Sequence, residues 1–241
     1  MIDNKIIDDF LTATTLANSK PAENTPSLDL PNGIGEIIKL PEPELLADVN
    51  VNFLELVEIR STVRQYQNTP LTQKDLSYLL WCTQGVKAQD NSGRTKRTVP
   101  SAGGTHTFTT FLYIQNVEGL KAGLYRFLAA EHALLFIEES AAVAEEFFGG
   151  FKNKNLPQGS AVTFVWATDA AKMRARFGAR GMRYVWLDAG HVCQNLYLAA
   201  FAVGIGVCAV GAFDDAKLAA ALKLPNNADC FIAYAATVGK M

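Results

Sequence analysis

Two arginines and a hydroxyl group lie close together in the first third of the chain. In the stretch VEIRSTVRQYQ, residues 57–67, Arg60 and Arg64 are four residues apart and Thr62 lies midway between them. Guanidinium groups bind phosphate and carboxylate through paired hydrogen bonds. Residues four apart are neighbours on a helix surface, so both side chains would share one face if the stretch is helical. The spacing is typical of an anion site and also of a solvated helix face.

The overall charge of the chain argues against nucleic acid as the anion that such a site binds. Lysines and arginines number 22 against 24 acidic residues, which gives a net charge of −2. Nucleic-acid binding needs a basic face that neutralises many phosphates, so a nucleic-acid partner is not expected. Hydrophobic residues make up 49% of the 241 residues, which is enough for a substantial core.

The cysteine pattern favours a reducing compartment. None of the four cysteines forms a C-x-x-C pair, and all of them lie in apolar runs, as buried thiols do. A disulfide framework is not expected in a chain of this size, and the N-terminal stretch has no apolar signal-peptide core. We therefore expect a cytoplasmic protein.

The most apolar stretch, residues 184–213, is interrupted by polar side chains within two turns of a helix. These side chains are Asp188, His191, Gln194 and Asn195. Polar groups at this density are costly in lipid, so the stretch predicts a buried helix and no membrane partner. His191 is expected to be a hydrogen-bonded core histidine, although the polar stripe could instead line a subunit interface.

The motifs of self-contained protein catalysis are missing from the sequence. The glycines of GIGVCAVG, residues 204–211, follow a predicted helix and precede a strand, which is the reverse of the dinucleotide-binding arrangement. No phosphate-binding loop, nucleophile elbow or paired carboxylates are found, and the three histidines are too dispersed for a predicted metal site. An enzyme with these residues would depend on a cofactor for the difficult chemical step.

The periodicity of the sequence predicts an α+β fold. An extended N-terminal arm is expected over 1–50 and a single domain over 51–241, with a polar loop at 87–99. Helices are predicted at 51–60, 69–86, 140–149, 169–178, 181–203 and 214–224. Strands are predicted at 108–115, in a hairpin over 123–139, at 160–168, at 206–211 and at 229–239.

Three blocks, in order from about residue 51 to the end, resemble the nitroreductase family of FMN flavoproteins. The first is Arg60-Ser61-Thr62-Val63-Arg64, followed by Tyr66, and the second is RTVPSAGGTHTFTTFLYI at 97–114. The third runs from 176 to 215 and combines a long helix, a Gly-x-Gly, a strand and the turn Val210-Gly211-Ala212-Phe213-Asp214. Within the family the sequence is most similar to the azoline-forming (thiazole-forming) dehydrogenases of peptide-toxin biosynthesis.

The resemblance implies a site for FMN at the interface of a homodimer, with a central mixed or antiparallel sheet and a long dimer helix. The first block would hold the FMN phosphate and the flavin edge through Arg60, Ser61, Thr62 and Arg64. The second would contact the flavin of the other subunit through Pro100, Ser101, Ala102, Gly103 and Gly104. In the third, the backbone at Val210 and Gly211 would approach flavin N5. NAD(P)H is the expected co-substrate, no metal is implied, and no catalytic side chain is assigned.

Two departures from the pattern leave other functions open. Residues 104–107 replace the branch's usual continuation, and Arg176-Phe177 stands where the azoline branch often has Lys-Tyr. The missing phenol argues against azole formation. The alternatives are a scaffold that holds flavin or peptide without turnover, an azoline-type dehydrogenase that uses oxygen as acceptor, and an apolar α+β domain without a cofactor.

Overall fold

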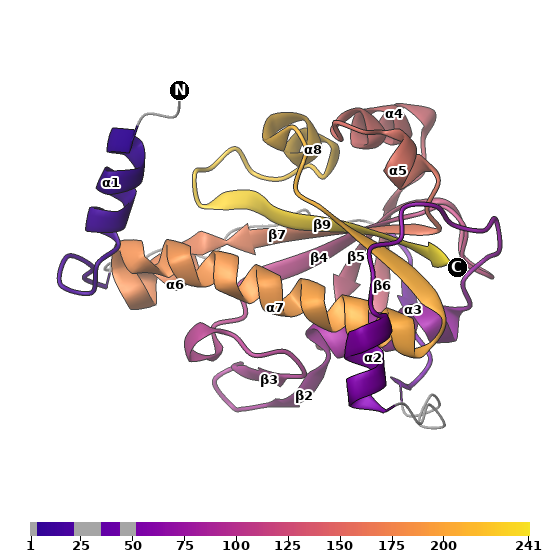
Figure 1. Cartoon of the computed structure of the whole chain (residues 1–241), viewed down its shortest axis with the longest axis horizontal. Helices are drawn as coiled ribbons and strands as arrows, with labels where there is room; N and C mark the ends of the chain where they lie inside the picture. The colour runs from indigo at the N-terminus through magenta and orange to yellow at the C-terminus, as the bar shows by residue number, and fades with distance from the viewer. Residues whose placement is uncertain (1–3, 22–34, 44–51) are drawn as a thin grey trace.

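A seven-stranded antiparallel sheet lies at the centre of the computed structural model, which describes residues 4–21, 35–43 and 52–241 (Figure 1). The strand order is β1-β6-β5-β4-β7-β9-β8, and each neighbouring pair is antiparallel. The strands are β1 (Ile37–Lys39), β4 (Phe108–Ile114), β5 (Gly123–Leu128), β6 (Ala133–Glu138), β7 (Val162–Asp169), β8 (Ile205–Val210) and β9 (Cys230–Lys240). The predicted α+β fold with a sheet between helices is confirmed.

Helices cover both faces of the sheet. The central strand β7 is buried throughout, with Phe164 and Trp166 in one hydrophobic cluster and Val165 in the other. This alternation follows from successive side chains pointing to opposite faces of a strand. One face carries α2 (Phe53–Ile59), α3 (Gln73–Gln84), α6 (Ala170–Phe177) and α7 (Gly181–Ala202). The other face carries α4 (Ala141–Gly149), α8 (Asp215–Ala221) and the short α5 (Asn155–Gln158).

The long helix α7 is the structural element to which most of the candidate site is attached. Its 22 residues span about 33 Å at the usual rise per residue. The Asn195 amide nitrogen donates to the Cys82 carbonyl at 2.9 Å, which joins α7 to α3. Helix α3 begins at the predicted capping box, in which Thr72 and Asp75 each accept from the other's backbone N–H. No helix within the described residues has the length and apolar character needed to cross a bilayer.

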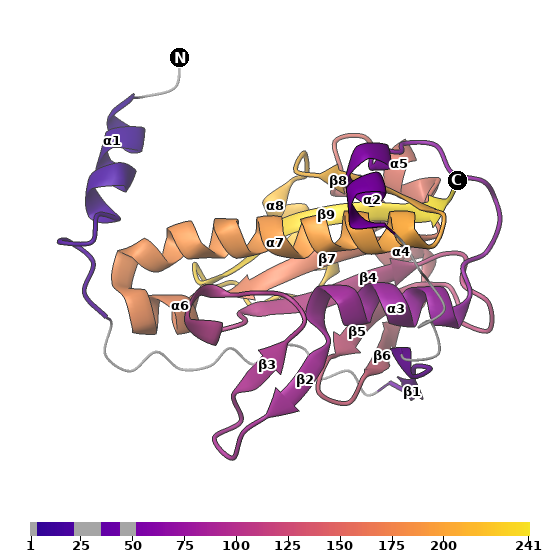
Figure 2. The same ribbon diagram turned by 60° about the horizontal axis from the view of Figure 1, so that its bottom comes forward.

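The extended arm predicted over 1–50 is helical in one described part and contains a strand in another. Residues Asn4–Ala13 form helix α1, which stands away from the sheet in both views (Figures 1 and 2), and Ile37–Lys39 pair with β6. The end of α1 is held by α7, because Arg183 Nε donates to Thr14 Oγ1 at 2.6 Å. Most of the proline-rich part of the predicted arm lies outside the described residues.

The polar loop predicted at 87–99 is instead a small hairpin of β2 (Val86–Gln89) and β3 (Thr95–Arg97). Its turn is fixed locally, since the Asp90 carboxylate accepts from the backbone N–H groups of Ser92 and Arg94 at 2.9 and 3.0 Å. The strands carry no apolar alternation, so their pairing has no signal in the hydrophobic pattern.

Candidate functional site

The first block is not helical, so the condition under which its arginines would share one helix face is not met. Helix α2 ends at Ile59, and the following residues run beside β8 and β9. The Val63 N–H donates to the Val207 carbonyl at 2.9 Å, and the Gln67 N–H donates to the Lys240 carbonyl at 2.9 Å. Residues two apart point the same way in an extended chain, so Arg60, Thr62 and Arg64 can still share one side.

Two glycines let this segment approach the sheet closely. A Cβ atom added at Gly206 would lie 2.7 Å from Val63 Cγ1, and one at Gly239 would lie 2.7 Å from Tyr66 Cγ. The Tyr66 hydroxyl donates to the Val63 carbonyl at 2.9 Å and lies 2.8 Å from Thr237 Oγ1. Burial raises the pKa of the Tyr66 hydroxyl, so it stays protonated as a donor. The position of the segment is therefore fixed by backbone contact and by one partly buried phenol.

Tyr197, on α7, connects the first block to the end of β8. The Arg60 guanidinium carbon lies 5.4 Å from the centre of the Tyr197 ring, within the range of a cation–π contact. The Tyr197 hydroxyl oxygen lies 3.3 Å from Thr62 Oγ1 and accepts from the Ala209 N–H at 2.9 Å. Tyr197 thereby links Arg60 and Thr62 to Ala209, which lies two residues before Gly211 in the chain.

A pocket of about 380 Å³ opens beside Gly211, where β8 ends. Its lining includes Trp186, Ala189, Gly190, Gly211, Phe213 and Tyr234. A Cβ atom at Gly211 would have Tyr234 as its nearest neighbour at 3.9 Å, so the space beside this backbone is open. Gly190 and Tyr197 are seven residues, or about 10 Å, apart on α7. A cationic strip and an aromatic pocket thus lie along one helix.

The second block is held by a buried acid on α7. The Ser101 hydroxyl donates to Asp188 Oδ2 at 2.6 Å, and the Ala102 N–H donates to Asp188 Oδ1 at 3.1 Å. Asp188 is 3% exposed, and burial raises the pKa of its carboxyl while the two hydrogen bonds lower it. The Ser101 oxygen also accepts from the His106 N–H at 2.9 Å, so this hydroxyl is already engaged within the chain.

In the turn at residues 101–104, Gly103 is covered by a neighbouring side chain and Gly104 is not. Gly103 has a φ of +58°, and a Cβ atom there would lie 2.6 Å from the Arg176 guanidinium carbon. Gly104 has a φ of +66° and nothing within 4 Å of an added Cβ atom. Pro100 and Gly104 are exposed, and no residue of 100–104 lines the pocket beside Gly211. The structure therefore joins the first block to the strand that ends at Gly211, whereas the second block contacts the third through Asp188 and Arg176 and lies outside the pocket.

Some other predicted residues have different surroundings from those expected. His191 was expected in the core, but its side chain is 52% exposed and its Nδ1 lies 4.0 Å from Asp188 Oδ1. The polar stripe is therefore not on one face of the helix: Asp188 is buried, whereas His191 is exposed. Ser61 is exposed, whereas Val210 is buried within the pairing of β8 with β9. Within the described ranges, no group of three or more potential metal ligands is found.

Two residues that organise the site were not assigned from the sequence. Tyr197 had no local signal, because its role depends on contacts with residues 135 and 12 positions away in the chain. Asp188 interrupts an otherwise apolar stretch of the sequence, and this isolation is the signal for a buried carboxylate that needs donors. Its partners in the second block could not be inferred from spacing.

The sheet order, the helices on both faces and the long α7 define a nitroreductase-like fold. A solved structure of a nitroreductase from Anabaena variabilis superposes with a TM-score of 0.72 at 23% identity, covering 99% of this chain. This chain spans 47% of that longer protein. A microcin synthetase complex of Escherichia coli (TM-score 0.62, 20% identity, 98% and 92% of the two chains) shares the fold.

The sequence comparisons establish the family. The model of the Nitroreductase family matches residues 57–240, and the chain belongs to this family. A protein of Methanocaldococcus jannaschii, named as a nitroreductase, is 33% identical over 180 residues, which is 74% of this chain and 88% of that protein. A nitroreductase structure from Desulfovibrio desulfuricans, solved in complex with FMN, superposes with a TM-score of 0.55 at 16% identity over 79% and 87% of the chains. Family membership indicates an oxidoreductase.

Proposed function

We propose that this protein is an FMN-dependent oxidoreductase that transfers hydride between a nicotinamide or organic donor and a small-molecule acceptor. The observation that carries the proposal is the strip from Arg60 and Arg64, past Tyr197, to the open backbone at Gly211. The elongated arrangement, cationic at one end and aromatic at the other, fits FMN, which has a phosphate at one end and a planar ring system at the other. FMN when bound would supply the hydride-accepting and hydride-donating chemistry.

The residues of the strip have separate tasks in this proposal. Arg60 and Arg64 hold the phosphate, whose charge is close to −2 at neutral pH, and Thr62 donates its hydroxyl. Tyr197 keeps Arg60 in place by the contact of its ring with the guanidinium group. Gly211 leaves its backbone N–H accessible beside the pocket, because no side chain covers it. Trp186 and Tyr234 give the pocket apolar walls that exclude water from the reacting face.

We further propose a homodimer, in which the second block completes the partner's site. Helix α7 exposes Trp186 and Leu187, at 47% and 59%, and α2 exposes Phe53 and Leu54, at 69% and 66%. Large apolar side chains exposed on α7 and on α2, which packs against α7, are typical of a protein–protein interface. The open surface at Gly104 would then lie against the partner. The four unpaired thiols support a cytoplasmic location.

The azoline branch is less well supported by the residues at its expected position. Phe177 stands in place of the phenol, and its ring packs edge-on against Tyr184 with centroids 4.9 Å apart. The Tyr184 hydroxyl accepts from Arg180 Nε at 2.9 Å. The Tyr184 phenol is thus bound to the arginine that precedes its helix, and it does not simply replace the missing phenol.

The test combines flavin binding with turnover. The purified protein is titrated with FMN and with riboflavin, and then reduced anaerobically with NADH or NADPH before nitroarenes, quinones and thiazolines are added. We expect FMN to bind at least about 10-fold more tightly than riboflavin, because only FMN offers the phosphate to the arginines. Arg60→Ala should remove most of that preference. Tight flavin binding without turnover of any acceptor would support the scaffold alternative instead.

A further inference from the structure

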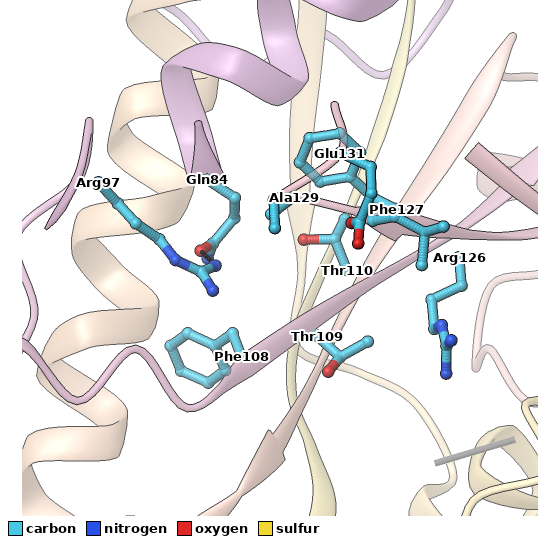
Figure 3. A pocket seen from close by; sticks show the side chains of 11 residues that line it. Gln84, Arg97, Phe108, Thr109, Thr110, Arg126, Phe127, Ala129 and Glu131 are labelled. Carbon is cyan, nitrogen blue, oxygen red and sulfur yellow. Dashed lines mark hydrogen bonds between the residues drawn. The ribbon is translucent and has the colours of Figure 1, made fainter. Parts of the chain in front are cut away.

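A second pocket, of about 250 Å³, shares no residue with the flavin strip or with the pocket beside Gly211 (Figure 3). It is formed where β3, β4 and the turn after β5 meet the end of α3. Its lining includes Gln84, Arg97, Phe108, Thr110, Phe127 and Glu131. The proposed flavin chemistry assigns no role to any of these residues.

Arg97 brings a positive charge into this pocket without a matching carboxylate. Its Nη1 donates to Gln84 Oε1 at 2.7 Å and its Nε donates to Thr95 Oγ1 at 3.1 Å, and both acceptors are neutral. Among the residues that the structure describes, no acid forms an ion pair with it. Burial lowers the pKa of Arg97 to about 10, so the side chain remains a cation at neutral pH. A partly buried guanidinium without an anion is costly, which makes an anionic ligand favourable.

The Thr110 side chain places a hydroxyl group without a hydrogen-bond partner in the same pocket. The residue is 2% exposed, and its Oγ1 has no hydrogen-bond partner. A buried hydroxyl without a partner costs about 1–3 kcal/mol, and nearly all such groups in folded proteins are satisfied. Figure 3 shows this hydroxyl between Gln84 and the turn that carries Glu131. A ligand oxygen placed in the pocket would satisfy it.

The remaining walls define the size and charge of that ligand. Phe108 and Phe127 give apolar surface, and the volume is smaller than that of most drug-sized ligand sites. Arg126 and Glu131 both line the pocket and carry opposite charges, so the charge of Arg97 is left over. A dianion such as phosphate would exceed this charge and would gain little from the aromatic walls.

We propose that this pocket binds a small monocarboxylate with an apolar body, of about the size of benzoate. The carboxylate accepts from the Arg97 guanidinium and from the Thr110 hydroxyl, and the apolar part packs against Phe108 and Phe127. Arg97 lies three residues before Pro100 in the chain, so the bound acid adjoins the second block. The inference does not require flavin to be bound.

The test is calorimetric titration of the purified full-length protein with benzoate, benzamide and sulfate. We expect benzoate to bind with one site per chain, benzamide to bind at least about 10-fold more weakly, and sulfate not to compete. Arg97→Gln should weaken benzoate at least about 10-fold. The matched control is Arg94→Gln, which removes the same charge from an exposed position on the same hairpin and should leave binding unchanged.

Thr110→Val separates a binding role from a structural one. Because the hydroxyl has no partner in the free protein, the variant should be at least as stable to urea as the parent, yet bind benzoate about 3- to 10-fold more weakly. A stable Thr110→Val variant with unchanged benzoate affinity would overturn the proposal. Equal binding of benzamide or sulfate would also overturn it. So would benzoate binding that perturbs only the flavin absorbance and survives Arg97→Gln.

Discussion

The contact between Gly206 and Val63 determines where the two arginines of the flavin strip lie. In Gly206→Ala the new methyl carbon would start 2.7 Å from Val63 Cγ1 and 2.8 Å from Val63 Cβ. Carbon atoms in ordinary contact are about 3.5 Å or more apart, so Val63 must move by about 0.8 Å. If the backbone follows this movement, the Val63 N–H to Val207 O distance lengthens from 2.9 Å, to about 3.7 Å at most, and the hydrogen bond is weakened or lost.

Two consequences follow from this displacement. Overpacking with the loss of one hydrogen bond should lower the free energy of unfolding by about 1–3 kcal/mol. Arg60 and Arg64 flank Val63, so their alignment with a phosphate should also be lost. One charge-assisted hydrogen bond is worth about 1.5–3 kcal/mol, so the Kd for FMN should rise about 10-fold or more. Riboflavin, which has no phosphate, should be affected much less.

The assay pairs urea unfolding with fluorescence titration of FMN and riboflavin. Gly149→Ala is the matched control, because its added Cβ has nothing within 4 Å and the residue ends α4, away from the strip. This control should change neither flavin affinity. If Gly206→Ala is destabilised as expected but keeps the parent's FMN affinity, the position of the Arg60 segment does not control phosphate binding, and the reasoning is refuted.

Three further predictions concern the elements around the strip. Asp188→Ala should lower the free energy of unfolding by about 2–4 kcal/mol, because two donors of the second block lose their acceptor; Asp188→Asn, which keeps one oxygen, should cost less in the same urea assay. Burial lowers the pKa of His106 to about 4, so the unfolded chain takes up the proton first and stability is lost as pH falls from about 6.5 towards 4. His106→Asn tolerates the φ of +48° and should flatten that loss in urea titrations at several pH values; an unchanged slope would assign it to other groups. Leu187→Arg should give a folded monomer by light scattering, and this monomer should bind FMN more weakly in a fluorescence titration. A variant that remains a dimer would show that Leu187 does not lie in the interface.

The parts of the fold that were predictable are those with local signals. Helix α3 was visible from the Thr72–Asp75 capping box, and α7 from its long apolar pattern ending at Gly204. The β2–β3 hairpin was missed because a carboxylate turn stabilises it and no hydrophobic alternation marks it. The site was predictable only as three separate blocks. Their juxtaposition depends on Tyr197 and on two glycines, whose long-range contacts leave no trace in residue spacing.

The spacing of Arg60 and Arg64 illustrates how a local rule can be overridden. Four residues correspond to one turn of a helix, but pairing with Val207 and Lys240 draws the segment out beside the sheet. The shared orientation survives in an extended chain, since the interval is also even. The candidate anion site therefore does not depend on which of the two conformations the segment adopts.

The central claim is that the Arg60 strip and the Gly211 pocket hold FMN, and the visible absorption spectrum of the purified protein tests it most directly. The protein is then denatured, and any released compound is identified by its mass. We predict a yellow protein that releases FMN, or a colourless one that turns yellow when FMN is added and keeps it through gel filtration. A protein that stays colourless after incubation with excess FMN would contradict the claim.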